Sequence, residues 1–156
     1  MVRPGLEPII TTMDDIKQNA INRGRKMNLP YAGALLPAEA HALMLKGARL
    51  VDVRTDAELH YVGSVPGSEA IEWNTLEGQR NPAFLQQLQQ VTSKDEPVMF
   101  LCRSGARSHA AAIAATQAGW KEAYNVLEGF EGDKNAEGQR NTVGGWKFAR
   151  LPWIQS

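Results

Sequence analysis

One stretch, residues 97 to 108, constrains the fold of this chain more than any other. Its first half, Val98–Leu101, is four apolar residues in a row between a proline and the single cysteine of the chain, Cys102. A short apolar run bounded by turn residues is typical of a strand buried in a parallel sheet. The alanine-rich segment 110–115 follows the loop and favours a helix. The order strand, short polar loop, helix predicts that Cys102 lies at the carboxyl edge of a sheet, where open α/β sheets bind ligands.

The loop after this strand contains groups that favour an ionised thiol. The thiolate is the nucleophilic form of cysteine, whereas an ordinary thiol is mostly protonated at neutral pH. A helix N-terminus, backbone N–H groups curled into an anion-binding nest, and the cations Arg103 and Arg107 would each stabilise the thiolate. Gly105 allows the positive φ that such a curl requires. We therefore interpret residues 102–107 as an anion-binding loop with Cys102 as its nucleophile.

The residues of this loop, Cys102-Arg103-Ser104-Gly105-Ala106-Arg107, resemble the six-residue active-site loop of rhodanese-type sulfurtransferases. Further segments resemble motifs of that family in the same order along the chain: Leu50–Arg54, Val65–Ser68, Asn125–Gly129, Gly144–Lys147 and Leu151–Trp153. The resemblance covers residues 34 to 154. Three positions, all outside the loop, depart from the family's usual histidine, alanine and glycine: Ser64, Ser68 and Phe130.

The resemblance implies a single-domain protein of the kind found in bacteria, with an α/β fold. It implies a five-stranded, mostly parallel sheet with helices on both faces, and the alternation of strand and helix segments argues for the same βαβ units. It also implies roles for site residues. Cys102 would be catalytic, the other loop residues would bind substrate (Arg103, Ser104, Gly105, Ala106 and Arg107), and three residues would support them (Asp52, Arg54 and Ser108).

The remaining patterns place the other elements. Apolar runs predict strands at 49–53, 68–73 and 122–127. Caps and helical spacing predict helices at 12–26 and 36–44, from Thr55, from Asn81, and from 110 to Gly119. We expect an N-terminal extension, residues 1–29, whose helix docks on the body or binds a partner, followed by a rhodanese domain over residues 30–156.

Two segments beside the loop leave alternatives open. Asp52 could accept hydrogen bonds from loop N–H groups while Arg54 pairs with Glu58 or another carboxylate, or Arg54 could face the substrate. The long polar segment 128–145 could form a rim over the pocket with Arg140 as an anion contact, or a solvated loop.

Composition gives no support to several classes of function. Lys+Arg and Asp+Glu both total 17, so the overall charge gives no reason to expect nucleic acid or a membrane as partner. One cysteine cannot form an internal disulfide, which suits a cytoplasmic protein. The three histidines (His41, His60 and His109) are not spaced to act as a base for Cys102, and His109 is expected two turns into its helix. No Cys/His spacing indicates a metal site, and no cofactor is expected.

The favoured hypothesis is a sulfurtransferase that moves a sulfane sulfur through a persulfide on Cys102. The donor would be a small anion such as thiosulfate, and the acceptor cyanide, a thiol or a protein. One alternative is a cysteine-dependent phosphatase or arsenate reductase. The active-site loop of those enzymes has the pattern Cys-(x)5-Arg, whereas four residues separate Cys102 from Arg107 here. Another is a non-catalytic rhodanese-like interaction module, although such modules often lose the cysteine.

Overall fold

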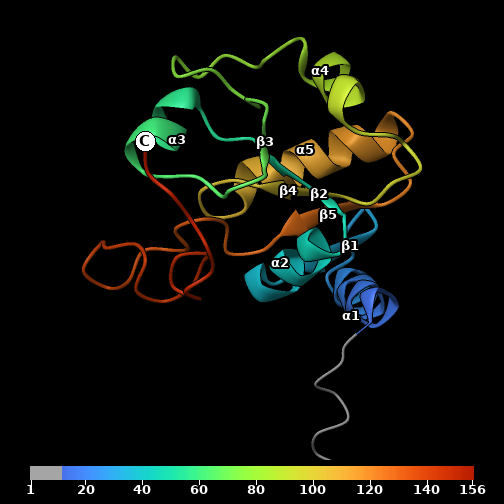
Figure 1. The fold of residues 1–156 in the computed structure, drawn as a ribbon, viewed down its shortest axis with the longest axis horizontal. Coiled ribbons are helices and arrows are strands. Elements are labelled where there is room, and N and C mark those ends of the chain that lie inside the picture. Colours follow the sequence, from blue (N-terminus) through green and yellow to red (C-terminus); the bar gives the residue numbers. More distant parts are fainter. Residues whose placement is uncertain (1–11) are drawn as a thin grey trace, which may run out of the picture.

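A computed structural model describes residues 12–156 and contains one five-stranded sheet (Figure 1). The strand order is β1-β5-β4-β2-β3, and every pairing is parallel. The strands are β1 (Gly33–Leu35), β2 (Arg49–Asp52), β3 (Glu69–Ala70), β4 (Val98–Leu101) and β5 (Ala123–Val126). The predicted α/β fold with a five-stranded parallel sheet is confirmed.

Helices cover both faces of this sheet, as Figure 1 shows. The helices are α1 (Met13–Lys26), α2 (Pro37–Leu45), α3 (Asp56–Tyr61), α4 (Phe84–Val91) and α5 (Ala106–Gln117). Side chains of α4 and α5 pack in one apolar core, and side chains of α1 and α2 pack in the other. The sheet therefore separates two cores, each closed by a pair of helices.

Strand β4 lies in the middle of the sheet and contributes to both cores. Val98 and Phe100 face the core of α4 and α5, whereas Met99 and Leu101 face the core of α1 and α2. All four side chains are fully buried, which explains why the strand is a continuous apolar run rather than an alternating one.

Two helix starts follow the predicted capping chemistry. The Thr12 hydroxyl accepts the Asp15 N–H at 3.1 Å, and the Asp15 carboxylate accepts the Thr12 N–H at 3.3 Å. Thr55 and Glu58 form the same reciprocal pair at the start of α3. Such capping boxes satisfy two backbone N–H groups that a helix start otherwise leaves without partners.

Helix α5 starts four residues before the alanine run, at Ala106, because Gly105 at φ 114° ends the loop there. The expectation that His109 lies two turns into the helix was therefore wrong, since it occupies the first turn. Helix α4 starts at Phe84 rather than at Asn81, whose side chain instead accepts the Ala83 N–H in the preceding turn.

Strand β1 was not predicted from the residues, and the segment 68–73 contains only the two-residue β3. Beyond β3 the chain still follows β2, because the Ile71 N–H donates to the Asp52 carbonyl and the Trp73 N–H to the Val53 carbonyl, both at 3.0 Å. The regular pairing of β3 with β2 therefore ends at Ala70, but the chain continues alongside β2 as far as Trp73.

Helix α1 packs closely against β1 and buries Ile16 and Ala20 in the second core. A Cβ atom at Gly33 would lie 2.7 Å from the Ala20 carbonyl carbon, so the helix and strand backbones are in direct contact. Within residues 12–156, no helix has the length and apolar character needed to cross a membrane.

Candidate active site

Cys102 directly follows β4 at the carboxyl edge of the sheet, where the sequence placed it. Its Sγ accepts a hydrogen bond from the Gly105 N–H at 3.1 Å and lies 3.2 Å from the Ser108 Oγ. The side chain is 1% exposed. The thiol is thus buried, with one backbone N–H and one hydroxyl as its polar neighbours.

The expected ring of backbone amides around the sulfur is formed only in part. Gly105 is the loop residue whose N–H reaches Sγ. The N–H groups of four other loop residues have no acceptor within the part of the chain that the structure describes: Arg103, Ser104, Ala106 and Arg107. The loop therefore holds several backbone donors that a bound anion can use.

The segment after β5 donates backbone hydrogen bonds to the cysteine loop. The Phe130 N–H donates to the Cys102 carbonyl at 2.8 Å, and the Glu131 N–H donates to the Arg103 carbonyl at 2.9 Å. Arg140, which one of the two alternatives made an anion contact, donates to the Gly132 carbonyl at 2.8 Å within its own loop. The segment 128–145 thus supports the cysteine loop through backbone hydrogen bonds.

Arg107 is bound by Glu58 in a two-pronged ion pair. The Arg107 Nη1 and Nη2 atoms lie 2.6 and 2.9 Å from the two Glu58 carboxylate oxygens. Burial raises the pKa of Glu58, but hydrogen bonds from Arg107 and Thr55 outweigh it and lower the pKa to about 2. The hydrogen bond from Arg107 to Glu58 raises the pKa of Arg107, against its burial. Sequence reasoning missed this pair because the two residues are 49 positions apart.

Asp52 and Arg54 form a second ion pair, which is fully buried. The Arg54 Nε and Nη2 atoms lie 3.0 and 2.7 Å from the Asp52 carboxylate, and Nη2 also donates to the Gly63 carbonyl at 2.8 Å. The Arg54 guanidinium lies over the Phe130 ring, 4.2 Å from its centre. Arg54 therefore pairs with Asp52 rather than Glu58, and its side chain has no exposed surface to offer a substrate.

A buried polar group supports the loop from the sheet side. Asn125, on β5, is 3% exposed, and its Nδ2 donates to the Gly105 carbonyl at 3.3 Å. Burial raises the pKa of the Tyr31 hydroxyl, and the nearby Asn125 side chain partly opposes this effect. The same hydroxyl lies 2.7 Å from Nδ1 of His109. Sequence reasoning named Asn125 only as part of the segment Asn125–Gly129 and gave neither Asn125 nor Tyr31 a role at the site, because their partners Gly105 and His109 lie 20 and 78 positions away.

A groove of about 470 Å³ lies beside the loop. Arg103 and Arg107 contribute to it, opposite the start of α3 and the segment 74–78. Its lining residues are Thr55, Ala57, Glu58, Val62, Asn74, Thr75, Leu76, Gly78, Arg103 and Arg107. The groove meets the cysteine loop at Arg103 and Arg107, and Cys102 itself is not among its lining residues.

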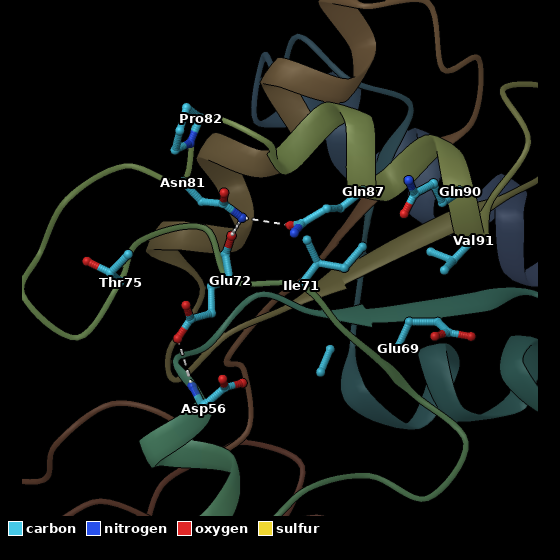
Figure 2. Close-up of a pocket in the computed structure, with 11 residues that line it drawn as sticks. Asp56, Glu69, Ile71, Glu72, Thr75, Asn81, Pro82, Gln87, Gln90 and Val91 are labelled. Atoms are coloured by element: carbon cyan, nitrogen blue, oxygen red, sulfur yellow. Dashed lines mark hydrogen bonds between the residues drawn. The ribbon is translucent and has the colours of Figure 1, made fainter.

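Figure 2 shows a neighbouring pocket of about 410 Å³ between α3, β3 and α4. Hydrogen bonds join some of the polar groups that line it. The Glu72 carboxylate accepts the Asp56 N–H at 2.9 Å, and the Asn81 Nδ2 donates to the side-chain oxygen Oε1 of Gln87 at 2.8 Å. Over residues 12–156, no three His, Cys, Asp or Glu side chains gather closely enough to hold a metal ion.

The sequence model of the rhodanese-like domain family matches residues 36–136, and the chain belongs to this family. A crystal structure of Rv0390 from M. tuberculosis is similar over 81% of this chain and 99% of its own, with 43% identity and a TM-score of 0.74. The family model thus names the family that the loop residues resemble, and the solved structure shares the fold of this chain.

Two curated relatives are similar over most of their own length. The "Uncharacterized protein RP600" of Rickettsia prowazekii is 35% identical over 113 residues, which cover 71% of this chain and 86% of that protein. "Thiosulfate sulfurtransferase GlpE" of Stutzerimonas stutzeri is 30% identical over 95 residues, which cover 61% of this chain and 78% of that protein. The family therefore contains relatives that carry a sulfurtransferase name.

Proposed function

We propose that this protein is a sulfurtransferase that takes a sulfane sulfur from a small anionic donor, such as thiosulfate, onto Cys102. One observation carries the proposal: Sγ accepts the Gly105 N–H at 3.1 Å in a loop whose other N–H groups lack acceptors within residues 12–156. These donors and the start of α5 supply the partial positive charge that stabilises a sulfur anion.

The reaction needs two displacement steps. In the first, the Cys102 thiolate attacks the outer sulfur of thiosulfate, the S–S bond of the donor breaks, and its electron pair leaves with sulfite. In the second, a nucleophilic acceptor such as cyanide or a thiol attacks the outer sulfur of the persulfide, and the Cys102 thiolate leaves. Two separate half-reactions predict ping-pong kinetics. The chain has one cysteine, so the acceptor is an external molecule or protein.

The proposed roles of the other loop residues follow from their contacts. The exposed side chain of Arg103 attracts the anionic donor into the groove, and Arg107 lines the same groove while bound to Glu58. The Ser108 hydroxyl contacts Sγ and can donate to the thiolate. Ser104, Gly105 and Ala106 supply backbone N–H groups to the persulfide anion. A reducing compartment such as the cytoplasm keeps the thiol available for this cycle.

Intact-mass spectrometry after treatment with thiosulfate tests the proposal. The protein should gain one sulfur atom, lose it on addition of cyanide, and release thiocyanate. Cys102→Ser should keep the circular dichroism spectrum of the fold and gain no sulfur. Retention of most sulfur transfer by Cys102→Ser would refute the assignment. Hydrolysis of a chromogenic phosphate ester without sulfur uptake would favour the phosphatase hypothesis instead.

A further inference from the structure

Asn125 places a buried polar side chain on a face of the sheet that is otherwise lined with apolar residues. It belongs to β5, which runs between β1 and β4. Ala123, on the same strand, packs in the core of α4 and α5, whereas Tyr124 and Val126 pack in the other core. Because side chains alternate along a strand, Asn125 faces the same core as Ala123. The amide therefore occupies a position where an apolar residue is expected.

Only one end of this amide has a hydrogen-bond partner within residues 12–156. Nδ2 donates to the Gly105 carbonyl at 3.3 Å, whereas Oδ1 is buried without a partner. Because a carbonyl oxygen can only accept, Nδ2 is the end of the amide that must face Gly105. A buried acceptor without a partner lowers stability, so an apolar side chain would suit the fold better here. Packing alone does not explain an asparagine at this position.

The Gly105 carbonyl receives hydrogen bonds from two different elements. The His109 N–H donates to it at 3.1 Å from the first turn of α5, and Asn125 donates to it from the sheet. Gly105 itself has φ 114°, and a glycine restricts the rotation of its two peptide units less than any other residue. The bond from Asn125 therefore restrains the loop at its least restricted residue.

The peptide unit between Gly105 and Ala106 passes this restraint on to the anion-binding side of the loop. The unit is trans, so its N–H and its carbonyl point in opposite directions. A Gly105 carbonyl held towards α5 and the sheet turns the Ala106 N–H out of the N-terminal end of the helix. That N–H has no acceptor within the described part of the chain. If the unit turned over, a carbonyl oxygen would take the place of this donor and repel an anion.

Resting on the sulfurtransferase function, we propose that Asn125 is a positioning residue that aims the N–H groups of Gly105 and Ala106 at the sulfur anion on Cys102. The Gly105 N–H lies 3.1 Å from Sγ, and the free Ala106 N–H is the next donor for the outer sulfur of the persulfide. Asn125 acts through the Gly105 carbonyl and not on the sulfur itself. Its replacement should therefore change the reactivity of the thiol more than the stability of the fold.

Titration of the Cys102 thiolate by its ultraviolet absorbance tests this role, with Cys102→Ser as the blank. Cys102 is the single cysteine, so the signal reports on one thiolate. Asn125→Leu and Asn125→Ala both remove the donor but differ in size. Each should move the titration midpoint up by about 0.5–1 pH unit, because a weaker hydrogen bond favours the thiolate less. Sulfur uptake from thiosulfate near neutral pH, followed by intact mass, should slow about three- to tenfold. The charged and titratable groups around the loop are the same in these variants: Arg103, Arg107, Glu58, Asp52, Arg54 and His109.

Thr92→Val is the matched control. The Thr92 hydroxyl is also buried and accepts a hydrogen bond from Trp120 Nε1 at 2.9 Å. Trp120 packs in the core of α4 and α5 but precedes β5, so this pair lies at the opposite edge of the sheet from the cysteine loop. Thr92→Val should lower the urea concentration at which the protein unfolds and leave the thiolate titration and the rate of sulfur uptake unchanged.

The outcomes distinguish this inference from the proposed function. If the unmodified protein gains no sulfur from thiosulfate, the sulfurtransferase function is wrong, and the titration still decides whether Asn125 acts on Cys102. If both Asn125 variants titrate like the unmodified protein, or Thr92→Val shifts the midpoint as far, Asn125 is a packing residue and the inference is overturned. A shift in only one of the two Asn125 variants would assign the effect to side-chain volume and would overturn it as well.

Discussion

Gly129 offers a direct test of how the segment after β5 supports the cysteine loop. It has φ +67°, and a Cβ atom there would lie 2.5 Å from both the carbonyl carbon and oxygen of Arg103. The same atom would lie 2.6 Å from the Cys102 carbonyl oxygen. Real Cβ atoms do not approach backbone atoms this closely, so Gly129→Ala must push the two segments apart.

The expected destabilisation has two parts. An alanine at this positive φ costs about 1–2 kcal/mol, as any non-glycine residue does in this region. The clash with the loop backbone adds about 1–3 kcal/mol, the usual range for overpacking a rigid site. Gly138 is the matched control, because it has φ +79° and no atom within 4 Å of its would-be Cβ. Gly138→Ala should therefore show the first part alone.

Urea denaturation gives the free energy of unfolding of both variants, and intact-mass spectrometry gives their rate of sulfur uptake. We expect Gly129→Ala to lower the free energy of unfolding by about 2–5 kcal/mol and to slow sulfur uptake by the protein that remains folded. Gly138→Ala should lower the free energy of unfolding by about 1–2 kcal/mol and take up sulfur at the normal rate. Equal losses in the two variants, with equal rates of uptake, would show that Gly129 does not position the loop.

Two further predictions concern the ion pairs. Arg54→Met leaves the fully buried Asp52 carboxylate without its partner and should lower the free energy of unfolding by about 3–5 kcal/mol in urea. The Asp52→Asn/Arg54→Met double variant should lose less, and an additive loss would contradict this reasoning. The pKa of Glu58 is about 2 in the folded protein, against an ordinary value of 4.5, so the stabilisation that Glu58 provides is complete above about pH 4.5 and is lost as the pH falls towards 2. In urea titrations, the free energy of unfolding of the unmodified protein should exceed that of Glu58→Gln by about 1–2 kcal/mol at neutral pH and by little near pH 2. A difference that stays constant with pH would refute the assignment.

The elements that the sequence predicted well carry their signal locally. The apolar run of β4, the capping boxes at Thr12 and Thr55, and the proline that starts α2 each involve neighbouring residues. Strand β1 carries no such signal, because its three residues are buried by contacts with α1 and β5 rather than by their own pattern. Its existence depends on the tertiary fold.

At the site, too, the features that depend on neighbouring residues were predictable, and those that depend on distant residues were not. The position of Cys102 after β4 and the positive φ of Gly105 were predictable, because both depend on the loop itself. The pairing of Arg107 with Glu58, and the support of Gly105 by Asn125, join residues 49 and 20 positions apart. Residue types alone do not determine which of several carboxylates or amides reaches the loop, so these contacts required the structure.

The close contact of α1 with β1 limits how far this protein can be shortened without disturbing its fold. The family match begins at residue 36, after both elements, and ends at 136, before the fully buried Trp146. A fragment with those ends would lose the strand that pairs with β5 and would leave β5 as an open sheet edge. Open edges favour pairing between molecules, so a fragment cut at the ends of the family match would be less suited to fold alone than one that keeps α1 and β1.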